Sequence, residues 1–137
     1  MNYALITGGS RGIGRAVAVQ LASQGYNILL NYKSNHAEAE ITKAAVELAG
    51  VRCELLPFDV ASREATDAAL GGWLETNKDA RIEVLVNNAG IRQDNLFIWL
   101  TEEQWSGVIS TSLDAFFYVT KHVLNQMLAA RFGRIIT

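Results

Sequence analysis

Short apolar runs alternate with amphipathic segments along the whole chain. Four such runs cover residues 3–7, 28–30, 53–58 and 84–86, and each is followed by polar residues or glycine. Apolar runs of this length are typical of strands that are buried on both faces of a sheet. A further run starts at Arg134 and continues to the last residue, Thr137, so the sequence predicts a fifth strand in which the chain ends.

Between these runs, apolar side chains recur at helical spacing. We expect helices over about 13–23, 35–49 and 62–77, a short helix after Thr101, and a long one from about Gly107 to Arg131. Ser34 or Asn35 can cap the second helix, and Thr101 with Gln104 has the spacing of a capping box. In the first two helices the faces expected to be buried are Ile13, Ala16, Val17 and Leu21, and then Ile41, Ala45 and Leu48.

This alternation of strands and helices determines the expected fold. Strands that are apolar on both faces, separated by helices, predict a parallel sheet with helices covering both sides. Right-handed crossover connections then favour a doubly wound α/β fold with the strand order 3-2-1-4-5. A length of 137 residues corresponds to a single domain, and the sequence contains no internal repeat or linker.

The composition excludes several classes of function. Half of the residues are apolar, 19% are charged and the net charge is −2, with no basic run, which argues against a nucleic-acid partner. No stretch of eighteen apolar residues exists, so we expect no membrane partner. Cys53 is the single cysteine, and no cysteine or histidine cluster has zinc spacing. We therefore expect a cytoplasmic domain without a bound metal.

A glycine-rich loop joins the first predicted strand to the first predicted helix. Gly8 allows a sharp turn, Gly12 leaves space for a pyrophosphate against the helix N-terminus, and Gly14 permits close packing of the helix on the strand. Its position between a strand and a helix favours dinucleotide binding by a domain spanning residues 1–137, whereas a glycine turn without a ligand is the alternative. The residues expected to contact the nucleotide here are Gly8, Ser10, Arg11, Gly12, Ile13 and Gly14.

The spacing Thr-Gly-x-x-x-Gly-x-Gly resembles that of the short-chain dehydrogenase/reductase family. Further motifs agree over the whole chain: Asp59-Val60, Asn87-Asn88-Ala89-Gly90, the long helix, and Gly133-Arg134-Ile135-Ile136. Residues 10–14, Asn31-Tyr32 and the segment 90–95 are most similar to bacterial 3-oxoacyl-[acyl-carrier-protein] reductases. This resemblance implies a Rossmann fold and NADPH-dependent reduction of a 3-oxoacyl thioester on acyl carrier protein to its (R)-3-hydroxyacyl form in fatty-acid biosynthesis.

The resemblance also assigns roles to residues after the third and fourth strands. It implies that the Asp59 side chain meets the adenine amino group and that Val60 packs on the adenine ring. An alternative for Asp59 is a cap on the following helix. Asn88, Ala89 and Gly90 lie beside the switch point of the strand order, where small side chains let the cofactor ribose approach the backbone. Asn87 is expected to be structural and to bond neighbouring strands.

The choice of cofactor can be argued from charge. An NAD enzyme usually places a carboxylate about 20 residues after the glycine loop, where it accepts hydrogen bonds from the ribose 2′-hydroxyl. Here the second strand is followed by Lys33 and Ser34, and the next acid, Glu38, lies in a helix. Lys33 and Arg11 can neutralise a 2′-phosphate while Ser34 donates a hydrogen bond, so we predict NADP(H). A solvated turn lysine is the alternative for Lys33.

Reductases of the family that the chain resembles need a serine, a tyrosine and a lysine that are not found here. None of the four tyrosines is followed by a lysine four residues later, and Ser112 takes the position of the family's helix asparagine. We therefore expect an incomplete domain that lacks the catalytic half. A nucleotide-binding module without catalysis and a reductase of another carbonyl substrate are the alternatives. A methyltransferase usually has an acid at the end of its second strand, which is absent.

The long helix carries more apolar surface than one contact can bury. We expect one side formed by Ile109, Leu113, Phe116, Val123 and Met127, widened by Phe117, Leu124 and Leu128. The resemblance implies a homo-oligomer, a dimer or tetramer, formed through the helix around Ile109–Leu128, while coverage by the chain's own residues is the alternative. We also expect one sheet face to lie bare beside the fourth and fifth strands.

Overall fold

Five parallel strands form one sheet in the part of the chain that the structure, a computed structural model, describes: residues 1–90 and 97–137. The sheet order is β3-β2-β1-β4-β5, which confirms the predicted doubly wound topology. Residues 91–95 of the motif 90–95 lie outside the described residues. The strands are β1 (Asn2–Ile6), β2 (Asn27–Tyr32), β3 (Cys53–Pro57), β4 (Arg81–Val86) and β5 (Arg134–Ile136).

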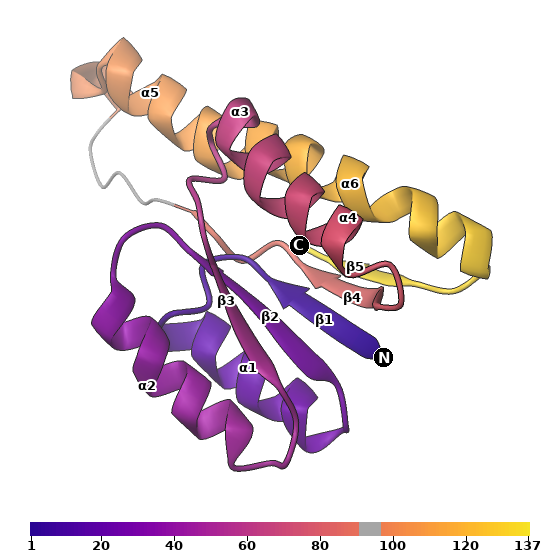
Figure 1. The fold of residues 1–137 in the computed structure, drawn as a ribbon. Coiled ribbons are helices and arrows are strands. Elements are labelled where there is room, and N and C mark those ends of the chain that lie inside the picture. The colour runs from indigo at the N-terminus through magenta and orange to yellow at the C-terminus, as the bar shows by residue number, and fades with distance from the viewer. Residues whose placement is uncertain (91–96) are drawn as a thin grey trace.

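Helices cover both faces of the sheet. In Figure 1, α1 and α2 lie on one face, while α3, α4 and α6 lie on the other. Asn35, one of the two predicted caps, accepts a hydrogen bond from the Glu38 N–H at the start of α2. The helices are α1 (Gly12–Ser23), α2 (His36–Glu47), α3 (Arg63–Thr66), α4 (Gly72–Thr76), α5 (Glu102–Ile109) and α6 (Ala115–Ala130).

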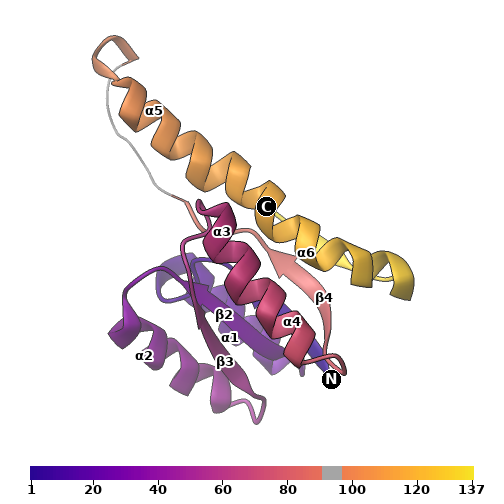
Figure 2. The same ribbon diagram turned by 45° about the horizontal axis from the view of Figure 1, so that its top comes forward.

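The predicted break between a short helix and a long helix near Gly107 was wrong. A π-helical turn over Ser110–Asp114 joins α5 to α6, so the two form one long rod, which Figure 2 shows clearly. The predicted capping box starts this rod, because Thr101 Oγ1 accepts from the Gln104 N–H at 3.1 Å and Gln104 Oε1 accepts from the Thr101 N–H at 3.1 Å. The rod ends at Arg131, whose φ of 53° is left-handed. A single glycine therefore did not interrupt the helix.

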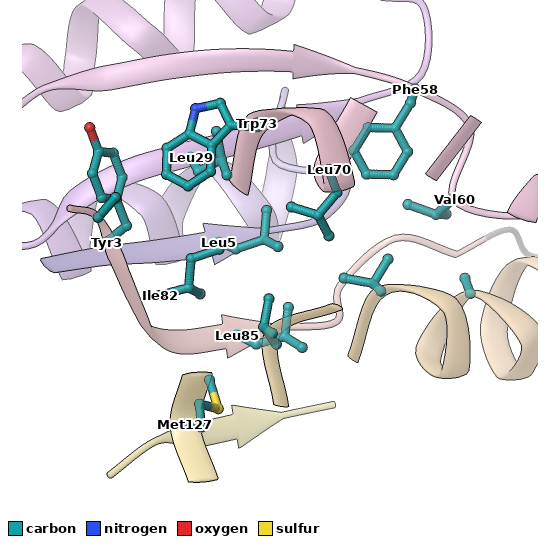
Figure 3. Close-up of a cluster of buried hydrophobic side chains, with 14 residues drawn as sticks. Tyr3, Leu5, Leu29, Phe58, Val60, Leu70, Trp73, Ile82, Leu85 and Met127 are labelled. Carbon is teal, nitrogen blue, oxygen red and sulfur yellow. The ribbon is translucent and has the colours of Figure 1, made fainter. Parts of the chain in front are cut away.

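Alternating residues of the strands pack into two separate hydrophobic cores, one on each face of the sheet. Leu5, Leu29 and Leu85 point toward α4 and α6, where they pack with Leu70 and Trp73 (Figure 3). Their sequence neighbours point to the other face, in a cluster formed by Ala4, Ile6, Ala18, Ala22, Ile28, Leu30, Val46, Cys53, Val84 and Val86. Because consecutive side chains of a strand point to opposite faces, strands buried on both sides need apolar residues at every position, as the sequence pattern indicated.

The predicted buried faces of α1 and α2 were right only in part, because Val17 and Leu21 of α1 are partly buried against the core. Small residues face the sheet instead: Gly14, Ala18 and Ala22 in α1, and Ala39, Thr42 and Val46 in α2. Three large apolar residues of the predicted faces point outward: Ile13, Ile41 and Leu48, with Ile13 at 76% and Leu48 at 90% exposure. Small side chains allow a helix to lie close to a sheet that is itself filled by leucine and isoleucine, so size and not hydrophobicity alone selects the inner face.

The predicted apolar side of the long helix also needs correction. Val123 and Met127 are buried, but Leu113 at 62% and Phe116 at 38% are exposed. The buried side is formed by Ala115, Val119, Thr120, Val123 and Met127. The exposed apolar residues are Leu113, Phe116, Phe117, Leu124 and Leu128. Leu113 lies within the π-helical turn, which changes its direction relative to the residues of α6, and a regular helical projection does not include this change.

The expectation of a bare sheet face holds only for the last strand. Val84 and Val86 of β4 are buried in the cluster with α1. In β5, Arg134, Ile135 and Ile136 are all exposed, and this strand forms the edge of the sheet beside β4. In the described residues, no helix is long and apolar enough to cross a bilayer, and no group of acidic, histidine and cysteine side chains could hold a metal ion.

The buried thiol of Cys53 predicts an alkaline loss of stability. Burial raises the pKa of this thiol from 9.0 to about 12. The unfolded chain therefore loses the thiol proton at a lower pH than the folded protein does. The free energy of unfolding is unaffected by this group below pH 9 and falls as the pH rises from 9 toward 12. We expect the free energy of unfolding, measured in urea, to fall between pH 8 and 10.5 by about 2 kcal/mol more than in Cys53→Ala. An equal fall in both proteins would contradict this prediction.

Candidate functional site

A cavity of about 270 Å³ opens where the loops after β1, β2, β3 and β4 meet. In an open α/β sheet, the carboxyl ends of the strands at the point where the strand order reverses are where ligands bind. The predicted site residues in its lining are Gly8, Ser10, Arg11, Lys33, Ser34, Asp59, Val60, Ala89 and Gly90. The predicted residues Gly12, Ile13, Gly14 and Asn88 are not in its lining, which also includes Asn31, Tyr32, Asn35, Phe58 and Thr111.

Asn31, near the end of β2, holds the glycine turn from below. Its Oδ1 accepts from the Gly8 N–H at 3.2 Å, and its backbone carbonyl accepts from the Gly9 N–H at 2.9 Å. Its Nδ2 donates to the carbonyls of Phe58 at 3.0 Å and of Leu56 at 3.3 Å. One buried side chain thus ties the loop after β1 to the end of β3, across the floor of the cavity.

Thr7 connects the same turn to the loop after β4. Its hydroxyl oxygen accepts from the backbone N–H groups of Asn88 at 3.1 Å and Ala89 at 3.0 Å. The Asn88 side chain in turn donates from Nδ2 to the Gly8 carbonyl at 3.0 Å. Asn88 therefore acts here as a support of the cavity wall and does not line the cavity itself.

Asn87 has the structural contacts that the sequence predicts for it. Its backbone N–H donates to the Ile136 carbonyl at 2.8 Å, which links the loop after β4 to the edge strand β5. Its side-chain Nδ2 lies 3.4 Å from Thr120 Oγ1 on α6, a long hydrogen bond. Asn87 therefore anchors the loop to one strand and one helix.

Each of the three motif positions requires glycine for a different structural reason. At Gly14, an added Cβ would lie 2.5 Å from the Gly8 carbonyl oxygen and 2.8 Å from Gly9 Cα, so no side chain fits. Gly8 has a φ of 63°, and a Cβ there would lie 2.8 Å from Ala89 Cα. Gly12 has a φ of 59°, but a Cβ there would meet nothing within 4 Å. The open space at Gly12 fits the predicted room for a pyrophosphate, whereas Gly8 and Gly14 serve packing.

The N-terminus of α1 is favourable for an anion. Arg11 precedes the helix in an extended conformation, no side chain caps the first turn, and this turn contains no acidic residue. The first backbone N–H groups of a helix lack intrahelical partners and attract negative charge. No ion pair involves the exposed Arg11 within the described residues. Arg11 and the helix end therefore both favour anionic groups on this side of the cavity.

Lys33 and Asp59 face each other across the opposite wall. Lys33 Nζ lies 3.6 Å from Asp59 Oδ2, and the lysine side chain is 73% exposed. The other oxygen of Asp59 accepts from the Ala61 N–H at 2.9 Å. Ser62, and not Asp59, caps α3 by accepting from the Ala65 N–H at 3.1 Å. This excludes the helix-cap alternative for Asp59. The exposure of Lys33 leaves its alternative, a solvated turn lysine, in place.

The remaining predicted residues differ in their surroundings. Val60 is buried against the core while it also lines the cavity, as does Phe58. Ser112, at the family's asparagine position, lies in the π-helical turn after α5, and its Oγ would be 3.9 Å from a Cβ added at Gly90. Thr111 beside it lines the cavity. The structure thus brings the turn after α5 to the cavity that the loops after the strands form.

Comparison with known proteins agrees with this geometry. The family described as short chain dehydrogenase matches residues 2–137. The chain belongs to the short-chain dehydrogenase family. A crystal structure of a metagenomic short-chain oxidoreductase in complex with NADP superimposes with a TM-score of 0.89 at 29% identity, covering 98% of this chain and 60% of that chain.

Curated relatives in the short-chain dehydrogenase family extend well beyond the matched region. A 3-oxoacyl-[acyl-carrier-protein] reductase, FabG, of Staphylococcus epidermidis is 38% identical over 133 residues, which is 97% of this chain and 54% of that protein. An acetoacetyl-CoA reductase of Shinella zoogloeoides is 40% identical over 134 residues, which is 97% of this chain and 52% of that protein. The chain thus spans about half the length of the curated relatives it matches.

The role of Asn31 predicts a large and specific loss of stability. Asn31→Ala removes the acceptor of the Gly8 N–H and the donor to two buried carbonyls, so we expect the free energy of unfolding to fall by about 2–4 kcal/mol. Asn27→Ala is the matched control on the same strand, because Asn27 Oδ1 accepts a single exposed hydrogen bond from the Arg52 N–H. We expect that change to cost less than about 1 kcal/mol in urea unfolding. Equal losses would contradict the assignment.

Proposed function

We propose that residues 1–137 form the dinucleotide-binding domain of an NADP(H)-dependent short-chain oxidoreductase. The observation that carries the proposal is the position of Arg11, a cation without a carboxylate partner among the described residues, beside the uncapped N-terminus of α1 and the cavity. A carboxylate at the end of β2 would bind a 2′-hydroxyl and repel a 2′-phosphate, and none follows Tyr32 before α2. The complex of the metagenomic relative with NADP supports the same cofactor.

The residues of the cavity fit the parts of such a cofactor. The pyrophosphate would lie against the first turn of α1 at Gly12, where space is open, and Arg11 with Lys33 and Ser34 would hold the 2′-phosphate. Asp59 would accept from the adenine amino group, and Val60 would pack on the ring. Ser10, Ile13 and Gly14 would keep the loop close to the phosphates, while Ala89 and Gly90 would border the nicotinamide ribose, with Asn88 supporting that wall from behind. The bound cofactor would supply a hydride.

For the complete protein, we propose reduction of a 3-oxoacyl thioester on acyl carrier protein to the (R)-3-hydroxyacyl form in fatty-acid biosynthesis. The 38% identity with the Staphylococcus epidermidis reductase supports this substrate class. The 40% identity with an acetoacetyl-CoA reductase supports a 3-oxoacyl thioester with a different carrier equally well, and so keeps another carbonyl substrate open. A cytoplasmic location is proposed together with this activity, consistent with a single free and buried cysteine.

A homo-oligomer is part of the same proposal. The exposed apolar side chains of the long helix, among them Phe117, Leu124 and Leu128, form one outward stripe within the region Ile109–Leu128. Contiguous exposed apolar side chains of this kind are typical of interfaces. A dimer or tetramer through this helix would bury the stripe, whereas later residues of a longer chain are the alternative cover.

Removal of the Arg11 guanidinium tests the cofactor proposal. We expect Arg11→Ala to raise the Kd for NADPH at least about tenfold, because a charge-assisted contact to the 2′-phosphate is lost, and to leave the Kd for NADH within about twofold. The measurement is a titration of the 137-residue chain with each nucleotide, followed by cofactor fluorescence. Arg52→Ala, at the opposite end of the sheet, is the control and should change neither value. Tighter binding of NADH than of NADPH by the unaltered chain would contradict the proposal.

A chimera separates the enzyme from a binding module without catalysis. No tyrosine in this chain is followed by lysine four residues later, so the chain alone should bind NADPH and not oxidise it with acetoacetyl-CoA. Fusion of residues 1–137 to the second half of the Staphylococcus epidermidis reductase should restore oxidation, measured by the loss of NADPH absorbance. A chimera that folds and binds NADPH without turnover would favour the binding module.

A further inference from the structure

The loop between β2 and α2 is closed by a side-chain contact that the proposed function does not use. This loop, residues 33–35, lines the cavity, and it lies between Tyr32 and His36. Tyr32 Oη and His36 Nδ1 are 2.5 Å apart, so the two residues flanking the loop are joined by a hydrogen bond. The His36 backbone N–H also donates to the Ser34 carbonyl at 2.9 Å.

The second ring nitrogen of His36 determines the direction of this hydrogen bond. His36 Nε2 lies 3.3 Å from Glu40 Oε1, one helical turn further along α2. A carboxylate carries no proton to donate, so the contact with Glu40 favours the tautomer that has its proton on Nε2. In the neutral ring, Nδ1 is then the acceptor, and the Tyr32 hydroxyl is the donor. Burial and the nearby Glu40 raise the pKa of Tyr32, which keeps its hydroxyl protonated.

This chain of contacts connects a buried residue to an exposed one. The Tyr32 side chain is 4% exposed and belongs to β2, so its position is fixed by the sheet. His36 is exposed and begins α2, and its ring also lies against the Tyr32 ring, with the two centroids 5.8 Å apart. The buried residues of α2 fix the helix on the sheet. The hydrogen bond adds a direct link between the end of β2 and the first residue of α2, across the loop of Lys33, Ser34 and Asn35.

We propose that the Tyr32–His36 hydrogen bond positions the loop 33–35 for the 2′-phosphate of the cofactor, which makes His36 a positioning residue for NADPH over NADH. The inference rests on the proposed function. Lys33 lies on this loop and is held 3.6 Å from Asp59, and Ser34 follows it, so a displaced loop would misplace the donors on this wall of the cavity. Arg11 lies on the separate loop before α1 and would keep its contact.

The proposal predicts a loss that is confined to NADPH. We expect His36→Leu and Tyr32→Phe each to raise the Kd for NADPH by about 3- to 10-fold and to leave the Kd for NADH unchanged. His36→Asn places an acceptor oxygen where Nδ1 lies and should restore most of the NADPH affinity. The double variant Tyr32→Phe with His36→Leu should lose no more than either single variant, because both remove the same hydrogen bond.

Each outcome of these titrations has a definite reading. Unchanged NADPH binding in both single variants overturns the inference, and so does an equal loss for both nucleotides, which would indicate a structural role only. Losses that add in the double variant also overturn it. The unaltered chain could prefer NADPH, keep that preference in the Tyr32 and His36 variants, and lose it in Arg11→Ala. In that case the inference fails and the proposed function stands. No preference in the unaltered chain overturns both. Should His36→Leu not fold, Tyr32→Phe retains the buried ring and decides the result.

Discussion

The structure depends on the close approach of α1 to the turn that follows β1. A Cβ at Gly14 would lie 2.5 Å from the Gly8 carbonyl oxygen, closer than two non-bonded atoms can be placed, so the helix can start where it does only because residue 14 lacks a side chain. Ala18 and Ala22 continue the same small face along α1. The position of the helix N-terminus, and therefore of the cavity beside Arg11, follows from this contact.

The second requirement is that the polar backbone at the strand ends be satisfied without closing the cavity. The hydroxyl of Thr7 and the side chains of Asn31 and Asn88 form these hydrogen bonds from inside the protein. In the described part of the chain, no buried side-chain nitrogen or oxygen lacks a partner. The loops are thus held rigidly from below, which leaves their upper surfaces and the first turn of α1 to a ligand.

The sequence predicted the strand order and the loops of the site, because strand periodicity, glycine spacing and crossover handedness are local properties with few solutions. It did not predict that Ile13 and Leu48 point outward, since the choice of inner face depends on the space left by Leu30 and its neighbours. Asn31 was also missed as a support. Its signal was present, because an asparagine within an apolar strand must find buried partners, but the sequence does not show which ones.

The charge of the cavity is a local property and not one of the whole molecule. A net charge of −2 gives the chain no general attraction for an anionic cofactor, and at about 0.15 M salt an exposed charge acts over about 8 Å. Attraction must then come from groups at the cavity itself. Lys33 shares its charge with Asp59, whereas Arg11 and the N-terminus of α1 are not opposed by an acid in the first turn. The two walls therefore contribute unequally. The wall with Arg11 and the N-terminus of α1 has net positive charge. The wall with Lys33 and Asp59 has little net charge, and its contribution depends on where these two side chains are held.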